Sequence, residues 1–122
     1  SLADLKHEHG HLNVRDYEVV ALAKVVEEVL DFFESLLASE AKSAMSSIME
    51  SGESSNLAHA FNMITMLYKL KARHQPAKFF SRKDSGAVLD VKAQIIGGCY
   101  CLAKIVIAVG FFEYQFPYVL FF

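Results

Sequence analysis

Between residues 19 and 36, apolar side chains recur at alternating steps of three and four. They are Val19, Leu22, Val26, Val29, Phe33 and Leu36. This spacing lines one face of a helix, and the charged residues of the segment fall mostly on the other side. The pattern therefore predicts an amphipathic helix, which Asn13 or Asp16 would cap by accepting hydrogen bonds from unpaired backbone N–H groups. The polar residues 1–13 before it are expected to form a loose lead-in.

Two further helices are predicted before residue 75. The first spans 39–51, with an inner face of Ala41, Ala44, Met45, Ile48 and Met49. Gly52 and the polar run 53–56 end it, and a serine in that run is expected to cap the next helix. That helix runs from Leu57 to about Arg73 and would bury Leu57, Phe61, Ile64, Leu67 and Tyr68, with Leu70 at the edge. Pro76 cannot continue a helix, so it stops there.

Residues 75–86 are expected to form a connection rather than a helix. Phe79 and Phe80 would hold it against the core, while Lys78, Arg82 and Lys83 stay in solvent. Asp84 or Ser85 would then cap the last helix.

The last helix is the most apolar segment, since Lys104 is the only charge between Ala93 and Phe112. It carries two apolar stripes. One is Leu89, Ala93, Ile96, Tyr100, Ala103 and Ile107. The other is Val91, Ile95, Gly98, Leu102, Ile105 and Val109. Two stripes predict neighbouring helices on two sides. Glycine within a helix is tolerated best where another helix crosses closely, so we expect the tightest crossing at Gly97 and Gly98.

The final residues change to a period of two. The alternating apolar residues are Phe112, Tyr114, Phe116, Tyr118, Leu120 and Phe122. This period predicts an extended tail over 112–122, and Pro117 restricts it to an edge or an unpaired segment. A tail so apolar must be covered, either by folding back on its own helices or by docking on a second copy. The predicted fold is thus all-α: a four-helix-type bundle with a long central C-terminal helix and an extended aromatic tail.

Length and composition fit one globular domain over 1–122. The chain has 122 residues and 53% hydrophobic residues, which excludes disorder. With two closely spaced cysteines and no secretion signal, a cytoplasmic location is the default. Twenty residues from Ala93 to Phe112 are long enough to span a membrane, but Lys104 would cost about 2.5–3.5 kcal/mol there. In a water-soluble fold the upstream amphipathic helices can bury this segment, so we favour a core helix.

Charge is divided between the two halves of the chain. Residues 1–56 hold eleven acids and four bases, a balance of −7; residues 57–122 hold three acids and eight bases, a balance of +5. Most of the excess comes from six cations: Lys69, Lys71, Arg73, Lys78, Arg82 and Lys83. They suit an acidic partner, or a nucleic acid whose bases stack on Phe79 and Phe80. The overall net charge of −2 argues against a dedicated nucleic-acid binder.

Metal and cofactor signals are weak. His7, His9 and His11 lie on one side of an extended segment, as zinc ligands can, but a structural site needs four ligands and a rigid frame. The thioethers of Met45, Met49, Met63 and Met66, with the His59 imidazole, could hold copper or haem iron, yet methionines also fill core gaps without a metal. We therefore predict no cofactor.

Catalytic signals are equally weak. On a helix Cys99 and Cys101 point about 200° apart, so they share neither a metal nor a bond and are interpreted as inert thiols. The acidic residues Glu27, Glu28, Asp31 and Glu34 lack the Glu-x-x-His pairs of carboxylate metal bundles and are interpreted as a solvated face. No hydrolase or phosphate-loop motif occurs. A pocket with convergent polar groups near His59 or His74 would favour an enzyme.

The function that these patterns favour is a non-enzymatic helical interaction module. It is predicted to self-associate through the final helix and the aromatic residues Phe112, Tyr114, Phe116, Tyr118 and Phe122. The alternative is binding of a nucleic acid or an acidic protein through residues 69–83.

Overall fold

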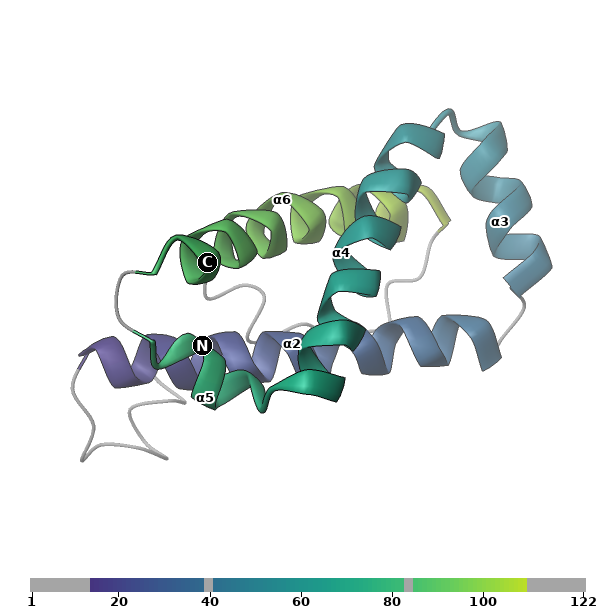
Figure 1. Ribbon diagram of the computed structural model, residues 1–122. Coiled ribbons are helices and arrows are strands. Elements are labelled where there is room, and N and C mark those ends of the chain that lie inside the picture. The colour runs from purple at the N-terminus through teal and green to yellow at the C-terminus, as the bar shows by residue number, and fades with distance from the viewer. Residues whose placement is uncertain (1–13, 39–40, 83–84, 110–122) are drawn as a thin grey trace.

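The computed structural model describes residues 14–38, 41–82 and 85–109, and within these ranges it is almost entirely helical and contains no strand. The all-α prediction is therefore confirmed. The helices are α2 Val14–Ala38, α3 Ala41–Glu50, α4 Ser54–Arg73, α5 Pro76–Phe80 and α6 Gly86–Val109 (Figure 1). The predicted lead-in 1–13, the end of the last helix beyond Val109 and the tail 112–122 lie outside the described residues.

The helix at the centre of the described fold is α4. It contacts α2, α3 and α6, and its packing against α6 is the most extensive in the fold. Figure 1 shows α4 crossing α2 and α6 rather than running beside them. The expectation that the last helix is central does not hold for the described residues, because α6 lies along one edge of the molecule (Figure 1).

The hydrophobic core joins one face of each helix. Leu22, Val26 and Val29 of α2 are almost fully buried, and Val19 and Phe33 are partly buried against the same core. The predicted inner face of α2 is therefore confirmed. Valine is a mediocre helix former, so this helix depends on burial, at about 1.5–3 kcal/mol for each apolar side chain fully removed from water.

The buried face of α4 is broader than its sequence pattern predicts. It consists of Leu57, Ala60, Met63, Ile64, Leu67 and Leu70. The prediction was wrong for Phe61, which is 37% exposed, and for Tyr68, which is only partly buried. Their rings instead lie against Phe33, at centroid distances of 5.8 and 6.3 Å and in edge-to-face geometry. Because α4 packs between α2 and α6, its inner face must include the smaller Ala60 and the flexible Met63.

Glycine and backbone contacts, rather than a serine cap, shape the turn into α4. Gly52 adopts a positive φ of 77°, a conformation that favours glycine, and this ends α3 as predicted. The residue that precedes α4 is Glu53, whose side chain does not cap the helix. The expected serine cap was wrong, because Ser54 and Ser55 already belong to the first turn of α4. The Glu53 carboxylate accepts a hydrogen bond from Asn56 Nδ2 instead.

The predicted connection 75–86 contains a short helix, α5. Pro76 ends α4 as expected and also begins α5, because proline lacks the N–H that a first helical residue does not need. Phe79 and Phe80 are buried as predicted, with Phe80 1% exposed. Ser85 caps α6 by accepting a hydrogen bond from the Val88 backbone N–H at 3.2 Å.

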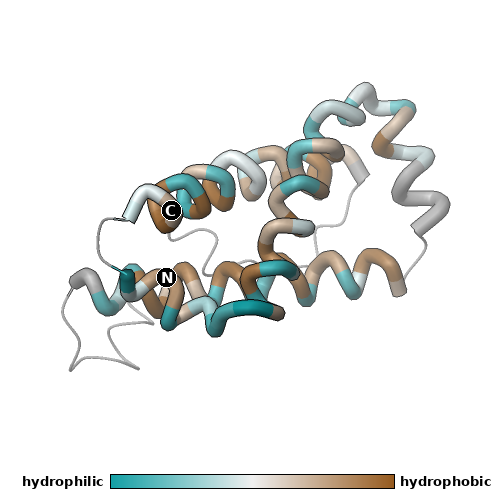
Figure 2. The backbone as a smooth tube through the Cα atoms, viewed as in Figure 1, coloured by the Kyte–Doolittle hydropathy of each residue, from teal (hydrophilic) through white to brown (hydrophobic). Residues whose placement is uncertain are grey.

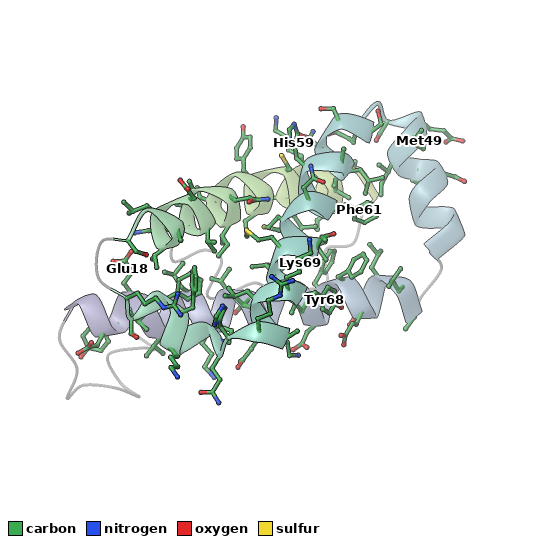
Figure 3. All side chains as sticks on the ribbon, in the orientation of Figure 1. Glu18, Met49, His59, Phe61, Tyr68 and Lys69 are labelled. Atoms are coloured by element: carbon green, nitrogen blue, oxygen red, sulfur yellow. The ribbon has the colours of Figure 1, made fainter. Side chains whose placement is uncertain are left out.

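The inner face of α3 is confirmed in one position and wrong in another. Ile48 is fully buried, whereas Met49 is 60% exposed (Figure 3). The side chains of residues 41–45, and so the rest of this predicted face, lie outside the description.

Candidate functional site

The most distinctive surface of the described fold is one side of α6. The large apolar residues exposed there are Leu89, Ile96, Tyr100 and Ile107, with exposed fractions of 56, 45, 65 and 66%. Ala93 and Ala103 of the same stripe are exposed as well. We call these six residues the outer stripe of α6. The prediction that both stripes of this helix are buried was therefore wrong.

The second stripe is the one that meets the core. Ile95, Gly98, Leu102 and Ile105 are buried and Val91 is partly buried, while the side chain of Val109 lies outside the description. The helices that pack most against α6 are α4 and α3, and Met63 of α4 lies against Gly98 of this inner stripe. In Figure 2 much of α6 is brown, which marks apolar residues, although only its inner stripe has a partner among the described helices.

The same helix has the length and composition of a membrane span. Within the described residues, Gly86–Ala108 is the single candidate, with 23 residues, and 28% of its most apolar stretch is buried. Length and composition are weak evidence for a span, because soluble core helices share them. Most of this apolar stretch is therefore not covered by the described helices.

The two adjacent glycines of α6 have different surroundings. Gly98 is buried against Met63, as the prediction of a close crossing requires. Gly97 is exposed, and a Cβ built on it would meet nothing within 4 Å, so the prediction was wrong for this residue. Only one glycine can point at α4, because neighbouring residues on a helix are about 100° apart.

A shallow groove of about 440 Å³ lies between α4 and α6. Its lining residues are His59, Asn62, Gln94, Gly97, Gly98, Tyr100 and Cys101. The groove brings together the His59 imidazole, two side-chain amides and a thiol. From the sequence, a polar pocket near His59 was the feature expected to favour an enzyme. His59 and Asn62 are exposed, however, and within the described residues no hydrogen bond joins His59 to Cys101. Among the described residues, the groove therefore holds no hydrogen-bonded pair of base and nucleophile.

The two cysteines differ in environment. Cys99 Sγ lies 3.8 Å from Met63 Sδ, and burial, with a smaller effect of the Glu28 charge, raises the pKa of its thiol to about 12. This supports the prediction of an inert thiol for Cys99. Cys101 is partly buried and lines the groove between α4 and α6, on a different side of the helix from Cys99.

The predicted basic segment is a solvent-exposed surface. Lys69, Lys71, Arg73, Lys78 and Arg82 are all exposed, and Lys83 lies outside the described residues. In Figure 2 this junction of α4 and α5 is strongly hydrophilic, and Figure 3 places Lys69 and His59 toward opposite ends of α4.

The predicted stacking of bases on Phe79 and Phe80 was wrong, because only 6% and 1% of these two side chains are exposed. Arg82 lies over the Phe79 ring instead, at 5.5 Å.

The acidic face of α2 is also mostly in solvent. Glu27, Asp31 and Glu34 are exposed, and Glu27 pairs with Lys24 at 3.7 Å. Glu34 accepts a hydrogen bond from the Tyr68 hydroxyl at 3.1 Å. Burial of Tyr68, together with the hydrogen bond to this carboxylate and its charge, raises the pKa of the phenol.

In the described ranges no three His, Cys, Asp or Glu residues gather in a way that could hold a metal ion. His7, His9 and His11 lie outside these ranges.

Two exposed charges, Asp90 and Lys104, lie beside the outer stripe. From the sequence, Lys104 was considered only as a charge within an apolar helix, and Asp90 was not considered. Among the described residues neither has an ion-pair partner, although Lys104 Nζ lies 4.8 Å from the centre of the Tyr100 ring. Their equal spacing from Gly97 is the signal that could have drawn attention to them. Lys92, by contrast, pairs with Glu18 of α2.

Comparison of the chain with protein-family models, with curated proteins and with solved structures finds no match to any of them.

Proposed function

We propose that this domain is a non-enzymatic helical interaction module that associates with a second copy of itself through the outer stripe of α6. The observation that carries the proposal is the exposure of Leu89, Ile96, Tyr100 and Ile107 along one face of one helix. From Leu89 to Ile107 the stripe is about 27 Å long, at 1.5 Å per residue. A continuous apolar surface of this kind marks an interaction site, whereas scattered apolar residues do not.

Pairing of two copies also completes the predicted architecture. The sequence indicates a helix with neighbours on two sides, and the described fold supplies a neighbour on one side only. A second copy on the outer stripe makes α6 central in a four-helix-type bundle, and this is the arrangement we propose for the assembly. The aromatic residues of the tail, 112–122, begin three residues after the end of α6 at Val109, and we propose that they extend the same interface.

The test is the mass of the full chain in solution. Sedimentation velocity over a series of concentrations is expected to give twice the monomer mass, falling to the monomer mass on dilution. Replacing two residues of the outer stripe, Ile96→Ser with Ile107→Ser, is expected to give a monomer with unchanged helix content by circular dichroism. Both side chains are exposed, so their loss leaves the core of the monomer intact.

A matched control uses apolar residues that are equally exposed but lie off α6. Leu37→Ser with Met49→Ser removes side chains that are 55 and 60% exposed and should leave the dimer unchanged. A wild-type monomer at every concentration would refute the proposal. So would flotation of the wild-type chain, but not the α6 variant, with phosphatidylcholine vesicles, because a lipid surface would then be the partner of the stripe.

A second candidate function is binding of an acidic protein through the basic segment. It is supported by the exposure of Lys69, Lys71, Arg73, Lys78 and Arg82, none of which forms an ion pair within the described residues. Retention on a heparin column at low salt, lost in Lys69→Glu with Lys71→Glu and falling steeply as salt rises, is the expected result. Absence of retention at low salt would refute it.

A further inference from the structure

We propose that the two copies pair through α6 in antiparallel orientation, about a twofold axis that passes beside Gly97. This inference rests on the proposed self-association and adds its geometry. It draws on three observations: the spacing of the outer stripe, the position of the two charges beside it, and the open surface at Gly97.

The outer stripe has the spacing of a coiled-coil seam. Its six members are separated by steps of four and three in strict alternation: Leu89, Ala93, Ile96, Tyr100, Ala103 and Ile107. Apolar residues at this average spacing of 3.5 keep one face of a helix against a second helix along its length. The stripe therefore fits another long helix better than it fits a compact partner.

The flanking charges decide the orientation. Asp90, Gly97 and Lys104 follow one another at intervals of seven residues, which is one heptad. They therefore lie on the same flank of the seam. A twofold axis perpendicular to the helices turns this flank toward the same flank of the second copy. Asp90 of each copy then lies level with Lys104 of the other, which gives two opposite-charge contacts.

A parallel pair would not bring these charges together. Its twofold axis runs along the helices, so each flank faces the opposite flank of the partner. That opposite flank carries Lys92, which already pairs with Glu18, followed at seven-residue steps by the apolar Cys99 and Val106. Asp90 and Lys104 are exposed and lack ion-pair partners among the described residues, so only the antiparallel pair supplies both with one.

The surface at Gly97 fits the position of the axis. Gly97 is midway between Asp90 and Lys104, and no atom lies within 4 Å of where its Cβ would be. A residue that lies beside a twofold axis faces the same residue of the second copy. A glycine at that position allows the two helices to approach closely. In this register Ile96 of each copy lies one residue from the axis, so the two Ile96 side chains meet at the centre of the seam.

Charge reversal tests the orientation. Asp90→Lys alone, or Lys104→Asp alone, sets like charges against each other twice per dimer and is expected to raise the Kd about tenfold. The double variant restores opposite charges in the antiparallel pair and should return the Kd to within about threefold of wild type. Glu50→Lys, an exposed reversal on α3, is the control and should leave the Kd unchanged.

Thiol cross-linking provides an independent measurement. In a Cys99→Ala, Cys101→Ser background, Gly97→Cys is expected to cross-link efficiently between copies with a short bismaleimide. Ala103→Cys lies on the seam but six residues from the axis, so its copies are about 18 Å apart along the helices, and it should not cross-link. In a parallel pair Ala103→Cys would cross-link as well.

The outcomes separate the two proposals. If the wild-type chain never dimerises, self-association and its geometry both fail. If outer-stripe variants dissociate the dimer but the double charge variant is no better than the single ones, or if Ala103→Cys cross-links, the antiparallel geometry is overturned while the proposed function stands.

Discussion

Gly98 of α6 lies directly against the side chain of Met63 of α4. A Cβ placed on Gly98 would lie 2.3 Å from Met63 Sδ and 2.5 Å from Met63 Cβ, closer than packed atoms approach. The same atom placed on Gly97 would meet nothing within 4 Å. The closest approach of the two helices therefore depends on one glycine of the pair, and the other is available to a partner.

This difference predicts opposite effects of the same substitution. Gly98→Ala is expected to lower the free energy of unfolding by about 1–3 kcal/mol, since the Met63 side chain and α4 must shift. Gly97→Ala is expected to raise it by up to about 1 kcal/mol, because alanine favours the helix and has free space. Urea unfolding at one low protein concentration measures both, since association would add to the apparent stability. Equal stabilities of the two variants would contradict the close packing at Gly98.

The two thiols are expected to react at different rates. With a pKa of about 12, Cys99 is about one ten-thousandth thiolate at pH 8, and the thiolate is the reactive form. Cys101 faces the groove and should react with Ellman's reagent at least about 100-fold faster. Single-cysteine variants, Cys99→Ala and Cys101→Ser, assign the two phases. A fast phase that survives in Cys101→Ser would contradict the burial of Cys99.

The raised pKa of Cys99 also predicts how stability changes at alkaline pH. Its thiol titrates near 9.0 when unperturbed and near 12 in the fold, so the folded state holds this proton more tightly. The resulting contribution to stability is complete below pH 9 and is lost as the pH rises toward 12. The difference in unfolding free energy between wild type and Cys99→Ala should therefore shrink from pH 8.5 to pH 11. A constant difference over this range would contradict the prediction.

Two phenylalanines should differ in their contribution to stability. Phe80 is 1% exposed and holds α5 against α2, so Phe80→Ala is expected to cost about 3–5 kcal/mol. Phe61 is 37% exposed and contributes mainly its edge-to-face contact with Phe33, so Phe61→Ala should cost about 1 kcal/mol. Thermal unfolding of the two variants ranks them. A larger loss for Phe61→Ala would contradict the observed packing of α4.

Local patterns were reliable where the signal lies within a few residues. The spacing of Leu22, Val26 and Val29 identified the inner face of α2, and Gly52 and Pro76 identified helix ends. Ser85, which caps α6, was one of the two predicted candidates. Each of these depends on backbone geometry or on one turn of helix. The short helix α5 was missed because five residues are too few for a periodic signal.

The faces of α4 needed more than a local pattern. Phe61 and Ile64 look equally suited to a core by hydrophobicity, yet Ile64 is 4% exposed and Phe61 is not buried. The difference arises from the direction in which α2 and α6 cross α4. That direction is set by packing between residues far apart in the chain, as the contact of Met63 with Gly98 illustrates.

The sequence alone determined that this protein is helical, where most of its helices lie, and that the last one carries two apolar stripes. Only the tertiary structure decided that Ile95, Leu102 and Ile105 face the core while Leu89, Ile96 and Ile107 face outward. The physical reason is that periodicity specifies which residues share a face but not what covers it. Both stripes favour burial, and the crossing of α4 at Gly98 satisfies only one of them.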